Sequence, residues 1–218
     1  MEERQVVVDA AHSVSLSIHG VGDTTVVMGP GAGGSRRTPF LLRTAEALVA
    51  SGRRAVLFNF PYTETGRRVP DAPALLEATV ARVAESVRAE GAVRVVLGGK
   101  SMGGRIASQA VAQGVAADAL VFLGYPLHPP GKPEKLRDKH LPDVTTPMLF
   151  VQGTRDEFAR WDLLEATLAR LGERATLLKI EDGDHSFVVR KKLTGRSAPE
   201  VEKEILEASQ AWLAARGL

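Results

Sequence analysis

The chain has 218 residues, of which 44% are hydrophobic and 25% are charged, and its formal net charge is +2. This length fits one domain with a sizeable core, which we expect over residues 1–218. The basic residues do not gather around aromatic ones as in a nucleic-acid-binding surface, so we expect no nucleic-acid partner. The absence of cysteine excludes disulfides and thiolate metal sites.

The first ten residues, MEERQVVVDA, are charged and do not resemble an apolar signal segment. No stretch of the sequence approaches the roughly 18 apolar residues that a membrane-spanning helix needs. We therefore expect a cytoplasmic protein that does not bind a membrane.

Short β-type runs alternate with helix-type runs along the chain. The first two predicted strands, 5–9 and 13–19, are too close in sequence for a helix between them, which indicates an antiparallel hairpin at one edge of a sheet. The later strands are continuous apolar runs, as expected for parallel strands covered by helices on both faces. These later strands are predicted at 24–28, 54–60, 93–98, 119–124, 147–152 and 175–180.

The predicted helices have recognisable ends. Thr38 and Pro39 are typical of an N-cap and a first helical position. A second helix ends near residue 90, and Ser197 with Glu200 forms the capping-box pattern of the last helix. This alternation predicts one α/β domain with a mostly parallel sheet of about eight strands and helices on both faces.

The stretch Gly99-Lys100-Ser101-Met102-Gly103 matches the G-x-S-x-G pattern of a nucleophile on a sharp turn between a strand and a helix. Such a turn strains the backbone of the serine and requires small neighbours two residues away. The alternative is a glycine-rich phosphate-binding turn, but neither G-x-G-x-x-G nor the P-loop pattern fits the sequence. We interpret Ser101 as a candidate nucleophile.

A serine nucleophile needs a histidine base that is oriented by an acid. In this kind of fold the chain order is serine, acid, histidine, with the last two after later strands. Asp156 follows the strand at 147–152, and His185 follows the strand at 175–180. We therefore predict a Ser101, Asp156 and His185 triad, with Glu157 as the competing candidate for the acid.

The developing oxyanion needs backbone N–H donors. The loop Gly29-Pro30-Gly31-Ala32-Gly33-Gly34-Ser35 follows the third strand and has few side chains to cover its amides. We assign the donors to the N–H groups of Ala32 and Met102, because Pro30 has no N–H.

Residues 125–146 separate two strands and include five prolines, so a large helical lid is not expected. The sequence leaves room for one short helix around residues 134–140. We expect this loop to form one wall of a substrate pocket, with Tyr125, Leu127 and His128 near the nucleophile and Tyr62 opposite them.

Six motifs together resemble the α/β-hydrolase superfamily, and in particular its small dienelactone-hydrolase-like members. They are GAGGS (31–35), FNFPY (58–62), GKSMGGR (99–105), GYPLHPPGKPEKLRDKHL (124–141), QGTRDEF (152–158) and GDHSF (183–187). The sequence is most similar to a branch with many bacterial hydrolases, a testis-expressed protein and a subunit of a chromatin acetyltransferase complex. Relatives often have histidine where this chain has Pro30, and dienelactone hydrolases proper have a cysteine nucleophile, which this chain lacks.

The resemblance implies acyl transfer, while the substrate has to be inferred from the site. We expect a serine hydrolase, without cofactor or metal, that cleaves a small carboxylic ester or thioester through an acyl-enzyme. The alternative is a binding or scaffolding protein that keeps the fold without turnover, as the chromatin-associated relative suggests. The presence of all three triad residues in the right order favours the enzyme.

Overall fold

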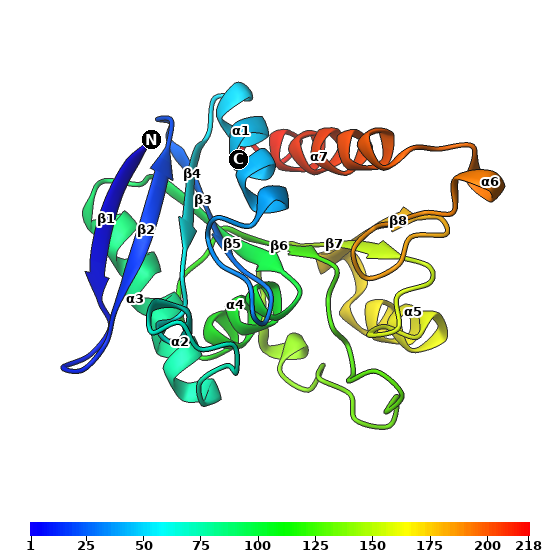
Figure 1. The fold of residues 1–218 in the computed structure, drawn as a ribbon, viewed down its shortest axis with the longest axis horizontal. Coiled ribbons are helices and arrows are strands. Elements are labelled where there is room, and N and C mark those ends of the chain that lie inside the picture. Colours follow the sequence, from blue (N-terminus) through cyan, green and yellow to red (C-terminus); the bar gives the residue numbers. More distant parts are fainter.

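A computed structural model describes residues 1–218 and contains one eight-stranded sheet in the order β1-β2-β4-β3-β5-β6-β7-β8 (Figure 1). The strands are β1 (Glu2–Val7), β2 (Ser13–His19), β3 (Thr24–Gly29), β4 (Arg54–Phe58), β5 (Arg94–Lys100), β6 (Ala119–Leu123), β7 (Met148–Gly153) and β8 (Ala175–Ile180). The β1–β2 and β2–β4 pairs are antiparallel, and all other pairs are parallel. The predicted edge hairpin and mostly parallel sheet are confirmed.

The first strand begins at Glu2, three residues earlier than the sequence indicates. Its first residues are polar because this edge strand has a solvent-facing side, where ion pairs replace apolar packing. Glu3 pairs with Arg36 and Arg37, and Arg4 pairs with Glu90. An edge strand of this kind carries too little apolar periodicity to be recognised from sequence.

Helices cover both faces of the sheet (Figure 1). The hydrophobic core is divided into two clusters, one on each face of the sheet. One cluster is covered by α1 (Pro39–Ala50) and α7 (Ala198–Ala214). The other is covered by α3 (Pro73–Ala89), α4 (Met102–Ala112) and α5 (Trp161–Leu171). The short helices are α2 (Pro61–Glu64), α6 (Lys191–Thr194), η1 (Leu141–Asp143) and η2 (Gly172–Arg174). None of the helices has the length and apolar character needed to cross a membrane.

The two predicted helix starts differ in their capping. Ser197 and Glu200 form the expected capping box at the start of α7. Thr38 precedes α1 but makes no cap hydrogen bond, because its hydroxyl accepts the N–H of Ser35 at 3.2 Å instead. The side chain of Thr38 therefore stabilises the preceding loop rather than the helix.

No lid covers the carboxyl edge of the sheet. Between β6 and β7 the chain contains only the 3₁₀ turn η1, and the predicted short helix at 134–140 is absent. The backbone there bonds across the loop instead, with the N–H of Arg137 donating to the carbonyl oxygen of Leu127 at 2.8 Å.

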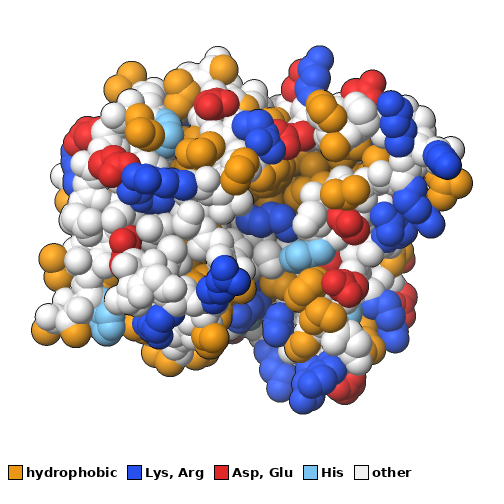
Figure 2. All heavy atoms as spheres, viewed as in Figure 1, with side chains coloured by type: hydrophobic (Ala, Val, Ile, Leu, Met, Phe, Trp, Pro, Cys, Tyr) orange, Lys and Arg blue, Asp and Glu red, His pale blue; other side chains and the backbone are white.

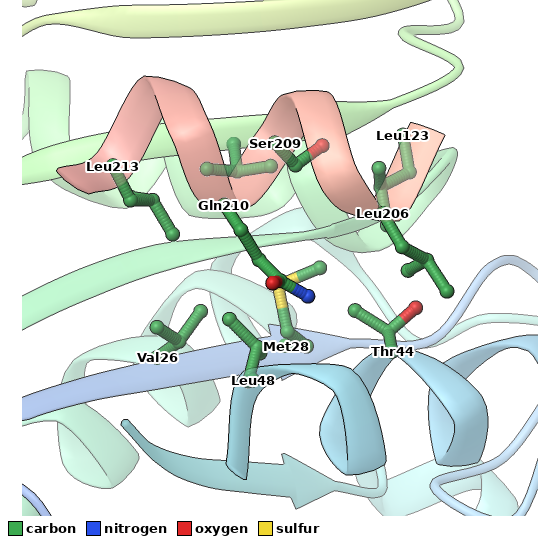
Figure 3. A pocket seen from close by; sticks show the side chains of 10 residues that line it. Val26, Met28, Thr44, Leu48, Leu123, Leu206, Ser209, Gln210 and Leu213 are labelled. Carbon is green, nitrogen blue, oxygen red and sulfur yellow. The ribbon is translucent and has the colours of Figure 1, made fainter. Parts of the chain in front are cut away.

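Helices α1 and α7 do not close completely over the sheet, and a cavity of about 20 Å³ lies between them (Figure 3). Its lining is mostly apolar and comprises Val26, Met28, Thr44, Leu48, Val121, Leu123, Leu206, Ser209, Gln210 and Leu213. The buried hydroxyl of Ser209 has no hydrogen-bond partner in the protein. A cavity of this size has room for about one water molecule.

Candidate active site

Ser101 forms the corner between β5 and α4. Its backbone has φ 50° and ψ −116°, a conformation that costs free energy for a residue other than glycine. The N–H of Ser101 donates to the carbonyl oxygen of Leu123 at the end of β6, with a distance of 3.1 Å. The strained corner is therefore attached to the neighbouring strand.

The glycines around Ser101 are required by a close approach of backbones. A methyl group added to Gly99 or to Gly103 would lie 2.2 Å from the carbonyl oxygen of Gly29, the last residue of β3. Such a distance is far inside van der Waals contact, and the atom it meets is backbone that cannot rotate away. The spacing of the G-x-S-x-G pattern thus reflects the packing of the corner against β3.

The structure brings Ser101, His185 and Asp156 into one hydrogen-bonded chain. Nε2 of His185 lies 2.8 Å from Oγ of Ser101, and Nδ1 of His185 lies 2.7 Å from Oδ2 of Asp156. The Asp156 side chain is fully buried, whereas that of His185 is 19% exposed. Glu157 is exposed and does not bond to the histidine, so the geometry favours Asp156 as its partner.

The carboxylate of Asp156 is held by two further donors. Nε2 of Gln152 donates to its Oδ2 at 2.5 Å, and the N–H of Phe158 donates to its Oδ1 at 2.8 Å. Oε1 of Gln152 in turn accepts the N–H of Tyr125 at 2.7 Å. Gln152 was not predicted as a site residue, although a fully buried amide near the end of an apolar strand is a signal that could have revealed it.

The loop that carries His185 is shaped by its two neighbouring aspartates. Oδ1 of Asp184 accepts the N–H groups of Ser186 and Val188 at 2.8 and 2.9 Å. Asp182 pairs with Arg190 and Arg155, and the hydrogen bonds from Arg190 lower the pKa of Asp182 to about 2. These contacts fix the turn without entering the Ser101–His185–Asp156 chain.

The predicted oxyanion donors are free. The N–H groups of Ala32 and Met102 donate to no acceptor within the protein. The loop of Ala32 passes next to the serine, since a methyl group on Gly31 would lie 3.6 Å from Cβ of Ser101. Tyr62 holds this loop, because its hydroxyl oxygen accepts the N–H of Gly33 at 3.1 Å.

The four predicted pocket residues do not line an open pocket. Tyr62, Tyr125, Leu127 and His128 are all at most 3% exposed. Tyr62 and Leu127 belong to the hydrophobic core, which explains their burial. His128 accepts the N–H of Arg160 at 2.8 Å and so ties its loop to the start of α5.

Tyr125 likewise packs inward. Its ring lies 5.1 Å from that of Phe122 and 5.5 Å from that of Phe150, measured between centroids. Its hydroxyl donates to the carbonyl oxygen of Arg137 at 2.8 Å, and burial raises the pKa of this hydroxyl. Tyr125 therefore holds the long loop against the sheet.

The face of the molecule seen in Figure 2 is hollowed beneath α1 and α7, and hydrophobic side chains form the floor of the hollow. Positively charged and histidine side chains lie at its rim.

No group of three or more His, Cys, Asp or Glu side chains is arranged to hold a metal ion.

The fold agrees with the comparisons. A family model described as an alpha/beta hydrolase domain matches residues 22–214, so the chain belongs to the α/β-hydrolase family. Three similar solved structures show the same fold at low sequence identity. They are a lidless α/β serine hydrolase from Xanthomonas campestris (21% identity, TM-score 0.77, covering 98% of this chain and 94% of that one), a dienelactone hydrolase from Anabaena variabilis (21%, 0.73, 98% and 97%) and a cold-adapted esterase from an Arctic intertidal metagenomic library (17%, 0.66, 96% and 93%).

The contact between Gly103 and Gly29 can be tested with Gly103→Ala. The added methyl group must displace backbone, so we expect the free energy of unfolding to fall by about 1–3 kcal/mol or more. Gly31→Ala is the matched control, because its methyl group would meet only ordinary contacts of 3.6 Å or more. Urea unfolding of both variants checks this, and equal stabilities would contradict the steric account of the corner.

Proposed function

We propose that this protein is a serine hydrolase that cleaves small carboxylic esters or thioesters through an acyl-enzyme, with Ser101 as nucleophile. The observation that carries the proposal is the hydrogen-bonded chain from Ser101 through His185 to Asp156. The free N–H groups of Ala32 and Met102 beside it support the same reading.

Acylation follows from this geometry. Oγ of Ser101 attacks the ester carbonyl carbon while Nε2 of His185 takes the hydroxyl proton. Asp156 keeps the imidazole in the required tautomer and stabilises the imidazolium. The N–H groups of Ala32 and Met102 donate to the negative oxygen of the tetrahedral intermediate. When the intermediate collapses, the C–O bond to the leaving group breaks and His185 gives it the proton.

Deacylation repeats the sequence with water. His185 removes a proton from a water molecule, which attacks the carbonyl carbon of the acyl-Ser101 ester. The second tetrahedral intermediate collapses to a carboxylic acid and regenerates the serine hydroxyl with the proton from His185. No step requires a metal or an organic cofactor.

The similar structures support an ester as the substrate. They include a serine hydrolase without a lid and an esterase. This chain has the same fold and likewise carries no lid over the carboxyl edge of its sheet. A small ester, rather than a long-chain lipid, therefore suits the site best.

The nucleophile can be identified with a fluorophosphonate probe. Only Ser101 has a base and oxyanion donors beside it, so we expect Ser101→Ala to abolish labelling and to lower kcat by about 10⁴ or more. Ser186→Ala is a matched control, because Ser186 is exposed and adjacent to His185, and it should label like the wild type. Label on Ser101→Ala would refute the assignment, and an unlabelled, folded wild type would favour a scaffolding protein.

The acid can be assigned by comparing two neighbours. Asp156→Asn should reduce kcat by about 10³–10⁴ while the protein stays folded, because the imidazole loses the partner that fixes its tautomer. Glu157→Gln should change kcat little, since Glu157 does not contact His185. Steady-state kinetics of both variants decides between them, and the reverse pattern would make Glu157 the acid.

Substrate size can be measured with p-nitrophenyl esters of two to twelve carbons. Each CH₂ group of the acyl chain that is buried against an apolar wall strengthens binding by about 0.8 kcal/mol. CH₂ groups that extend beyond the wall add nothing. Because the predicted pocket residues fill the core and no lid extends the site, we expect kcat/KM to peak between acetyl and butyryl and to fall beyond about six carbons. A value that keeps rising to decanoate would reveal a long acyl channel.

A further inference from the structure

Lys100 immediately precedes the serine, and its side chain is not used by the proposed chemistry. Along β5, Val96 packs in the core cluster beneath α1 and α7 while Leu97 packs in the other cluster. Because side chains alternate along a strand, Lys100 lies on the α1–α7 side of the sheet. Its neighbour Ser101 leaves the strand at the corner, so the two side chains approach the site from different directions.

The ammonium group of Lys100 reaches the loop that follows β8. Its Nζ donates to the backbone carbonyl oxygen of His185 at 2.5 Å and lies 5.1 Å from the centroid of the Phe187 ring. No carboxylate lies within ion-pair distance of it. A single lysine thus connects the end of β5, which carries the serine, with a loop 85 residues further along the chain.

Gly124 makes room for this arrangement. A methyl group on Gly124 would lie 2.9 Å from Nζ of Lys100 and 3.6 Å from Cε1 of His185. The ammonium group and the imidazole ring therefore both border the space next to Gly124. Gly124 also has φ +75°, a conformation that glycine adopts without strain.

The position of this half-buried lysine is costly. Burial lowers the pKa of Lys100 to about 8, and the carboxylates of Asp156 and Asp184 only partly oppose this effect. A methionine of similar length would fill the space without the cost of burying a charge. A lysine kept here at this cost points to a role other than stability.

We propose that Lys100 is a positioning residue for the serine hydrolase, which holds the loop of His185 against the strand end that carries Ser101. The proposal rests on the proposed function. Asp156 hydrogen-bonds to the imidazole ring of His185, and Lys100 donates to the backbone carbonyl oxygen of the same residue. Both the side chain and the backbone of His185 are therefore held in place. Its Nε2 then stays within reach of the serine hydroxyl throughout the reaction.

The test variant is Lys100→Met, assayed with p-nitrophenyl butyrate. We expect kcat to fall about 10- to 100-fold with KM within about twofold, because the base is misplaced rather than substrate binding lost. The midpoint of thermal unfolding should be unchanged or higher, since a half-buried charge is removed.

Two further variants are the controls. Lys179→Met removes an exposed lysine that also lies over an aromatic ring, 5.3 Å from the centroid of Trp161, and should keep the wild-type kcat. Lys100→Arg keeps a charged hydrogen-bond donor, and it should restore most of the wild-type kcat.

The outcomes separate this proposal from the proposed function. A wild type without Ser101-dependent hydrolysis or labelling would refute the function and, with it, any positioning role. Ser101-dependent hydrolysis with wild-type kcat in Lys100→Met would refute the positioning role alone. A lower kcat that Lys100→Arg does not restore, together with a lower unfolding midpoint in Lys100→Met, would show a merely structural lysine and would also overturn the proposal.

Discussion

The close packing of the first helical turn after β5 against the end of β3 is the constraint on which the rest of the structure depends. Gly99 and Gly103 both meet the backbone of Gly29 there, and no side chain fits between them. This contact fixes the direction of α4 and maintains the positive φ of Ser101, which unsupported backbone would relax. The serine is thereby held at the carboxyl edge of the sheet with the free N–H of Met102 behind it.

The parallel strand order then assembles the other groups at the same edge. The carboxyl ends of β5, β6, β7 and β8 lie side by side, so the residues that follow them meet across the sheet. Asp156 arrives after β7 already held by Gln152 and by the N–H of Phe158, and His185 arrives after β8 on a turn shaped by Asp184. In our account Lys100 completes this arrangement by joining the histidine loop to β5.

The sequence predicted those features that depend on strand order and local sterics. Apolar runs revealed the parallel strands, and the G-x-S-x-G spacing reflects the packing of Gly99 and Gly103 against Gly29. Features that depend on where a side chain turns after leaving a strand could not be predicted. Tyr125 was assigned to a pocket wall, but its ring packs with Phe122 and Phe150. The sequence does not reveal Gln152, because its amide meets the Asp156 carboxylate only after the chain turns back over the end of β7.

The formation of an acyl-enzyme on Ser101 is the central claim, and rapid-quench mass spectrometry tests it most directly. The protein is mixed with p-nitrophenyl butyrate, quenched in acid within milliseconds and digested. The account predicts one butyryl group per chain, located on the peptide that contains Ser101, which disappears as turnover ends. A burst of p-nitrophenol with the acyl group on any other residue, or hydrolysis without a covalent intermediate, would contradict it.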